Sequence, residues 1–170
     1  ASFTDAGIRH CFLKGSKVSR FYDEPEMRFM LDMDVYIEPL KIEEASKIME
    51  SRGYEIYIAE DDKDIGFTKK PFLNIELHKE LKYDYDKGYD YYKGAFERLK
   101  SAENSLALDM EKEDFYAYIL SHTAHHFETA GTGIRSVVDH YYLRKKLRPQ
   151  CDETKLCEGL SATGLSTFSE

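Results

Sequence analysis

The stretch Met30-Leu31-Asp32-Met33-Asp34-Val35-Tyr36-Ile37 places two aspartates, one residue apart, in an apolar frame. Alternate side chains of a β-strand point to the same face, so a strand over residues 31–37 would turn Asp32, Asp34 and Tyr36 to one face. The apolar residues between them would then face the core. Two neighbouring carboxylates on a half-buried strand repel each other and lose hydration, which is unfavourable unless a cation lies between them. The pattern therefore predicts a metal site on this strand.

A second stretch, expected to form a strand over residues 72–78, offers a third carboxylate. Its sequence Phe72-Leu73-Asn74-Ile75-Glu76-Leu77-His78 puts Glu76 and His78 on the polar face. If this strand neighbours the first, we expect Glu76 to join Asp32 and Asp34 as metal ligand and catalytic residue, with His78 supporting them nearby. Carboxylate oxygens suit Mg²⁺ or Mn²⁺ better than zinc. The alternative is that these carboxylates lie on solvated strand edges.

Upstream, Phe12-Leu13-Lys14-Gly15-Ser16 is an apolar approach that ends in Gly-Ser, before residues that can start a helix. A glycine lets the backbone come close to a phosphate, and the hydroxyl and amides after it can donate hydrogen bonds to it. This pattern predicts that Gly15 and Ser16 bind a triphosphate, with Lys14 and Arg28 as nearby cations. An ordinary strand-to-helix turn is the alternative.

In order and spacing, these motifs resemble the nucleotidyltransferase superfamily of polymerase-β-like enzymes. Fifteen residues separate Gly15-Ser16 from Asp32-Met33-Asp34, and Glu76 follows. A closer resemblance is to the bacterial family of uncharacterised nucleotidyltransferases. It rests on Phe12-Leu13-Lys14-Gly15-Ser16, Arg28 with Asp32-Met33-Asp34-Val35, Ile75-Glu76-Leu77-His78, and the cluster from His122 to His126 followed by Val138-Asp139.

The resemblance implies a metal-dependent enzyme that moves a nucleoside monophosphate from a nucleoside triphosphate to a hydroxyl and releases pyrophosphate. The acceptor is not identified, and a small molecule, a protein and RNA all stay open. Two other functions also stay open: a non-catalytic module that binds a nucleotide or a partner, and a toxin-type transferase paired with an antitoxin. The complete set of three carboxylates favours catalysis, because a module that only binds a nucleotide or a partner does not need three metal ligands.

Composition sets limits on the partners. The chain has 170 residues, 42% of them hydrophobic, and a formal net charge of −8. Proteins that bind long nucleic acids usually carry a basic face, so such a partner is not expected. Apolar runs are too short for a membrane span, and we expect a cytoplasmic protein. Residues 1–8 resemble the last turns of a helix, so we expect a fragment of a longer chain.

Strands and helices are expected to alternate along residues 9–82. We predict strands at residues 9–14, 31–37, 54–58, 66–70 and 72–78, and helices at residues 15–22 and 41–52. The expected fold class is α/β: a small mixed nucleotidyltransferase-like sheet with flanking helices against one face, followed by a helical C-terminal part. Residues 1–82 would form the catalytic core, residues 83–111 a Tyr/Asp-rich linker and connecting segment outside the core, and residues 112–170 a helical subdomain.

Three further patterns allow more than one interpretation. His122, His125 and His126 could bind a transition metal with Asp139, or could pack between helices or contact a base or acceptor. The R-x4-H spacing of Arg135 and His140 occurs in a helical ribonuclease type but arises readily by chance. Tyrosines of the linker could stack on a base, and its aspartates would suit a cationic acceptor: Tyr83, Tyr85, Tyr89, Tyr91 and Tyr92, with Asp84, Asp86 and Asp90.

Overall fold

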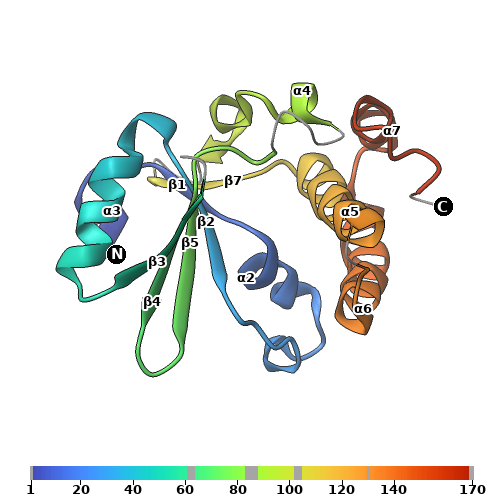
Figure 1. The fold of residues 1–170 in the computed structure, drawn as a ribbon. Helices are drawn as coiled ribbons and strands as arrows, with labels where there is room; N and C mark the ends of the chain where they lie inside the picture. The colour runs from blue at the N-terminus through green and yellow to red at the C-terminus, as the bar shows by residue number, and fades with distance from the viewer. Residues whose placement is uncertain (1, 61–63, 83–87, 102–104, 130, 169–170) are drawn as a thin grey trace.

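The computed structural model describes residues 2–60, 64–82, 88–101, 105–129 and 131–168. Within these ranges, seven strands form one mixed sheet in the order β3-β4-β5-β2-β1-β7-β6. The strands are β1 (His10–Phe12), β2 (Met33–Ile37), β3 (Glu55–Glu60), β4 (Asp64–Lys69), β5 (Leu73–His78), β6 (Lys100–Ser101) and β7 (Ala107–Asp109). Figure 1 shows the sheet in the middle of the molecule, between α3 and the C-terminal helices. The α/β class and the helical C-terminal part are confirmed.

The pairing of the central strands places the predicted site. Strand β2 runs parallel to β5 and antiparallel to β1. Strands β3, β4 and β5 form an antiparallel meander, and β7 pairs with β1 in parallel and with β6 antiparallel. The two stretches that carry the predicted carboxylates are therefore neighbours in the sheet.

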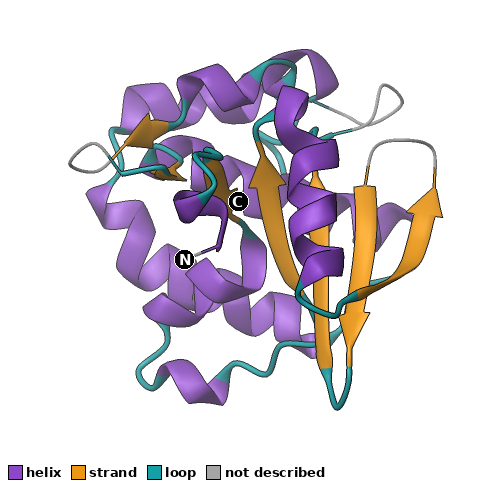
Figure 2. Ribbon diagram, turned by 90° about the vertical axis from the view of Figure 1, so that its left-hand side faces the viewer, coloured by secondary structure: helices purple, strands orange, loops and turns teal. Residues whose placement is uncertain are grey.

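Helices cover both faces of the sheet, and not the single face that we expected. Helix α3 (Ile42–Ser51) packs on one face, where Val35 and Ile37 are buried together with Ala45 and Met49 of the helix. It crosses in front of the strands in Figure 2. On the other face, Tyr36 is only 2% exposed and meets Phe96 edge to face at 5.1 Å between ring centroids. Both faces of β2 are therefore buried at its C-terminal end.

The C-terminal part is helical, as expected. It consists of α5 (Lys112–Thr129), α6 (Ile134–Tyr142), the π-helical turn η5 (Leu143–Leu147), η6 (Arg148–Gln150) and α7 (Glu153–Ala162). Asp152 caps α7, because its side chain accepts a hydrogen bond from the Lys155 amide at 3.0 Å. None of the described helices is both long and apolar enough to cross a membrane.

The short elements of the N-terminal part differ from the expected helix over residues 15–22. The chain instead forms α2 (Lys14–Val18), followed by the 3-10 turns η1 (Ser19–Phe21) and η2 (Pro25–Met27). The remaining short elements are α1 (Ser2–Asp5), η3 (Pro39–Lys41), α4 (Tyr89–Tyr92) and η4 (Ala95–Arg98). Pro39 begins η3 one residue after the end of β2, and Gly53, with φ +77°, lies at the C-terminal end of α3.

Two expectations about burial are wrong. The predicted strand over residues 31–37 begins only at Met33, whose side chain is 37% exposed, because the register with β5 starts at Met33 and Ile75. The linker is not confined to the surface either. Tyr92 is 2% exposed and packs edge to face on Tyr118 of α5. Its ring gains apolar contacts there, which the polar sequence around it did not suggest.

Candidate active site

Asp34 of β2 and Glu76 of β5 lie opposite each other in the parallel ladder. Paired residues of neighbouring strands point to the same face, so both carboxylates turn toward the C-terminal helices. Asp32 lies in the loop before β2, and all three carboxylates line one cavity of about 490 Å³. The structure thus brings the three predicted acidic residues together, although Asp32 does so from a loop and not from the strand.

Asp34 is the most enclosed of these carboxylates. It is 3% exposed, and its Oδ1 lies 2.8 Å from Lys14 Nζ and 2.9 Å from His78 Nε2. Burial alone would raise the pKa of Asp34. The hydrogen bond from His78 and the charge of Lys14 outweigh burial and hold this pKa well below its usual range. Asp34 is therefore ionised, with two cationic groups against one of its oxygens.

His78 links Asp34 to a carboxylate that sequence reasoning did not single out. Its Nδ1 lies 2.7 Å from Asp64 Oδ1, at the start of β4, where Asp64 and His78 are paired in the antiparallel ladder. Burial disfavours the imidazolium, but the hydrogen bonds with Asp34 and Asp64 outweigh it and raise the pKa of His78 to about 9. The signal for Asp64 was the hairpin between β4 and β5, because the break at Lys70-Pro71 pairs the start of β4 with the end of β5.

The group of potential metal ligands differs slightly from the predicted one. Single ligand atoms of Asp34, Glu76 and His78 all lie within 4.8 Å of one another, the only such group of three or more among the described residues. Burial, and then the charge of Asp34, raise the pKa of Glu76, and Tyr57 donates a hydrogen bond to its Oε1 at 3.2 Å. Asp32 faces the same cavity from a more open position.

The predicted phosphate-binding turn lies on the adjacent wall. Lys14 and Gly15 line the cavity, and Lys14 has φ +40°, a left-handed conformation that non-glycine residues rarely adopt. A Cβ added to Gly15 would lie 2.7 Å from Arg28 Nη1, so any larger residue here would require the Arg28 side chain to shift. Ser16 does not line the cavity, and its hydroxyl donates to the Leu13 carbonyl oxygen at 3.2 Å. Its role toward a nucleotide stays a prediction.

Arg28 connects this turn to the helical part. Its Nε and Nη2 each lie 2.8 Å from a carboxylate oxygen of Asp139 on α6, and Tyr22 donates to Asp139 Oδ1 at 2.5 Å. Asp139 is therefore engaged by an arginine and a tyrosine, and it does not join the histidines in a metal site. Among the described residues, the histidines and Asp139 form no group of three potential metal ligands, so nothing in the structure supports the transition-metal interpretation.

The helical wall of the cavity carries imidazole, hydroxyl and guanidinium groups. His122 and His126 of α5 line it, with their Nε2 atoms 3.1 Å apart, and burial lowers the pKa of His122 to about 2. Arg135 also faces this cavity, whereas His140 is hydrogen-bonded to Thr123 and lines a different one, so the R-x4-H pair is not brought together. The segment before α6 adds Gly131, Thr132 and Gly133 to the lining, none of which sequence reasoning singled out.

The aromatic linker contributes little to this cavity. Tyr83, Tyr85, Asp84 and Asp86 lie outside the described residues. Tyr89 and Tyr92 line a smaller cavity of about 210 Å³, and Tyr91 packs beside Tyr92. None of the described linker tyrosines lines the cavity with the carboxylates.

Two solved structures share the fold of this chain over most of its length. The antibiotic-resistance factor ANT(2'')-Ia is 11% identical over 99% of this chain and 88% of its own, with a TM-score of 0.63. An antigenic nucleotidyltransferase-like protein from Paracoccidioides brasiliensis is 11% identical over 94% of this chain and 80% of its own, with a TM-score of 0.54. The match to the lincosamide antibiotic adenylyltransferase LnuA, with 16% identity and a TM-score of 0.42, spans 48% of this chain and about half (52%) of that one.

The family comparison covers more of the sequence. A comparison with curated protein sequences finds no match. The model of a family described as uncharacterised nucleotidyltransferase matches residues 1–170, and the fold, with its acidic cavity beside a glycine turn, agrees with that assignment. The chain therefore belongs to the uncharacterised nucleotidyltransferase family and is a nucleotidyltransferase enzyme whose acceptor is not identified.

Proposed function

We propose that this enzyme transfers a nucleoside monophosphate from a nucleoside triphosphate to a hydroxyl of an acceptor, with a divalent metal and release of pyrophosphate. The observation that carries the proposal is the register of Asp34 with Glu76, which puts both carboxylates on the cavity that Gly15 and Arg28 also line. One cavity thereby combines carboxylates that can hold a metal with a glycine whose backbone a phosphate can approach closely. Phosphoryl transfer depends on both features.

The residues present fit a hard divalent cation. Asp32, Asp34 and Glu76 would hold Mg²⁺ or Mn²⁺, because carboxylate oxygens are the ligands that these ions prefer. His78 and Asp64 would keep the Asp34 carboxylate in place, since His78 lies within hydrogen-bond distance of both. When bound, the metal would neutralise charge on the triphosphate and polarise the phosphoryl group.

The other wall supplies positive charge for the phosphates. Lys14 and Arg28 lie beside Gly15, where the backbone can come close to a ligand. In this proposal Gly15 and Ser16 bind the triphosphate, and Lys14 and Arg28 balance its charge. Glu76, which faces the same cavity, is the base that we propose for the acceptor hydroxyl.

The acceptor would bind against the helical wall. His122, His126 and Arg135 face the cavity there. Asp139 also faces it but is already paired with Arg28. Because the net charge is −8, long nucleic acid is a poor acceptor in this proposal, and a small molecule suits the cavity better. The enzyme would act in the cytoplasm, where nucleoside triphosphates are available.

A transfer assay tests the proposal directly. The purified protein is incubated with each α-³²P-labelled nucleoside triphosphate and a metabolite extract, with Mg²⁺ or Mn²⁺, and Asp34→Asn serves as the control. We expect label to move to a new compound and pyrophosphate to appear, with the parent protein and not with the variant. Absence of transfer and of pyrophosphate with every triphosphate and both metals would contradict the proposed function.

A further inference from the structure

The Arg28 guanidinium contacts Asp139 on one side and faces Gly15 on the other. Its Nε and Nη2 form a two-point contact with Asp139 at 2.8 Å each, and its side chain is 8% exposed. Its third nitrogen, Nη1, is directed at Gly15, because a Cβ at that residue would lie 2.7 Å away from it. Asp139 thus sets the orientation of the guanidinium. The remaining nitrogen, Nη1, faces the Gly15 turn, which we propose binds the triphosphate.

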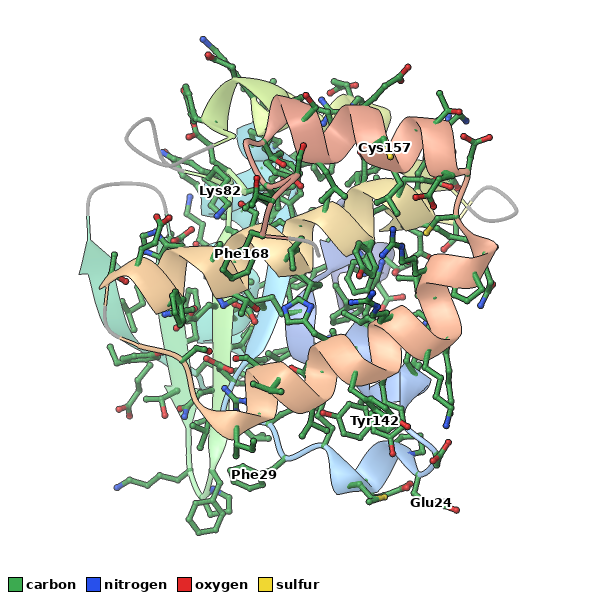
Figure 3. All side chains as sticks on the ribbon, turned by 90° about the vertical axis from the view of Figure 1, so that its right-hand side faces the viewer. Glu24, Phe29, Lys82, Tyr142, Cys157 and Phe168 are labelled. Carbon is green, nitrogen blue, oxygen red and sulfur yellow. The ribbon has the colours of Figure 1, made fainter. Side chains whose placement is uncertain are left out.

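Asp139 is itself fixed by two aromatic residues. Tyr22 donates its hydroxyl hydrogen to Asp139 Oδ1 at 2.5 Å, and its ring stacks on Tyr142, one helical turn further along α6, with 4.4 Å between centroids. Figure 3 shows Tyr142 on α6 beside the segment that carries Glu24. Planar two-point contacts between arginine and carboxylate fix direction as well as distance. The arrangement therefore joins α6 rigidly to the residue that reaches the glycine turn.

We propose that Asp139 is a positioning residue for the triphosphate: from α6, it aims Arg28 at the phosphates bound by the Gly15 turn. This inference rests on the proposed function. It makes the helical part a determinant of nucleotide affinity, although Asp139 lies 111 residues from Arg28 in sequence. A purely electrostatic role would have the opposite sign, because Asp139 adds negative charge near the phosphates and its removal would then strengthen binding.

The test is Asp139→Asn, which keeps the size of the side chain and removes its charge. We expect the dissociation constant of MgATP, measured by calorimetry, to rise about tenfold, which is the usual worth of one charge-assisted hydrogen bond. Magnesium tripolyphosphate, which has no base or sugar, should weaken by a similar factor. In the transfer reaction, KM for the triphosphate should rise while kcat stays within about twofold.

Asp23→Asn is a matched control. Asp23 joins the same N-terminal segment to the helical part through Lys146 Nζ at 2.6 Å and the Tyr142 hydroxyl at 3.3 Å, but it does not line the cavity. Breaking this second link should leave both dissociation constants unchanged. If Asp139→Asn fails to fold, Tyr22→Phe replaces it, because that change removes one hydrogen bond to Asp139 and keeps the aromatic ring; we expect about a threefold weakening.

The results distinguish failure of the positioning role from failure of the proposed function. A folded Asp139→Asn protein that binds MgATP as tightly as the parent, or more tightly, would overturn the positioning role alone. Equal weakening by Asp23→Asn would also overturn it, since loss of any link between the two parts would then suffice. A parent protein that binds no triphosphate would overturn the proposed function, and this inference with it.

Discussion

The surroundings of Asp34 decide how the site behaves without a metal. Lys14 and His78 approach the same carboxylate oxygen, at 2.8 and 2.9 Å. Sequence reasoning identified the repulsion between neighbouring carboxylates and concluded that a cation must offset it. The structure shows that two side chains provide such cations in the protein itself. A metal at Asp34 would therefore compete with the Lys14 ammonium.

Asp34→Asn should nearly abolish transfer. The change removes a proposed metal ligand, and such losses commonly lower the rate about 10³-fold or more. It also leaves Lys14 and His78 facing each other without their negative partner, so the metal-free variant should be less stable than the parent. Steady-state kinetics and thermal melting in chelator check the two parts. If the folded variant turns over at the wild-type rate, Asp34 takes no part in catalysis.

Lys14→Met should increase the stabilisation of the protein by Mg²⁺. Removing the ammonium costs the metal-free protein about 2 kcal/mol, because a buried carboxylate loses one charged partner while His78 remains. The same change removes the competitor for the metal, so Mg²⁺ should raise the melting temperature of the variant more than that of the parent. An equal rise for both proteins, measured by calorimetric melting, would show that Lys14 does not compete with the metal.

Individual strands and helices were predictable to different degrees. The alternation in β2 and β5 predicted both strands, and the parallel pairing then brought Asp34 opposite Glu76. The start of β2 was not predictable, because Leu31 is as apolar as a core residue yet 60% exposed in the loop. Asp139 was missed as the partner of Arg28, because this contact joins two segments 111 residues apart in sequence, which no local pattern encodes.

His122 of helix α5 should make the stability of the protein depend on pH. Burial lowers the pKa of His122 to about 2, with Lys14 and His126 acting in the same direction and Asp34 opposing them. The folded pKa lies below the unfolded value of about 6.5, so the stability linked to the neutral ring is present above that pH and is lost as the pH falls below it.

His122→Gln should remove this loss, because glutamine does not titrate. Between pH 7.5 and 5.5 the parent should lose about 1.4 kcal/mol more of its unfolding free energy than the variant does. Urea unfolding of both proteins at the two pH values measures the difference, without metal or nucleotide. Parallel losses in the two proteins would mean that the pKa of His122 is the same in the folded and the unfolded state.

The N-terminal and C-terminal parts share one hydrophobic core. Cys11, Leu13 and Tyr36 from the sheet side are buried in the same cluster as Phe115, Leu143 and Leu156 of the helical part. The boundaries proposed at residues 82 and 111 stay predictions, but this packing indicates that the two parts depend on each other for stability. Sequence periodicity found the helices, whereas the face of the sheet that they cover depends on contacts distant in sequence.

Leu143→Ala should therefore destabilise the protein as a unit. Leu143 is fully buried, and truncating it should cost about 2–5 kcal/mol. Unfolding followed by far-ultraviolet circular dichroism and by tyrosine fluorescence should give one coincident transition. Leu40→Ala, at a side chain that is 95% exposed, should leave stability nearly unchanged. Two separate transitions would show that the helical part unfolds independently.

The dependence of triphosphate binding on the metal tests the central claim most directly. Asp32, Asp34 and Glu76 line the same cavity as the glycine turn, so a triphosphate and these carboxylates should repel each other until a divalent cation lies between them. Titration calorimetry of the parent protein with ATP should therefore show at least tenfold tighter binding in Mg²⁺ than in chelator. Equal affinity under the two conditions would contradict a metal-dependent nucleotidyltransferase.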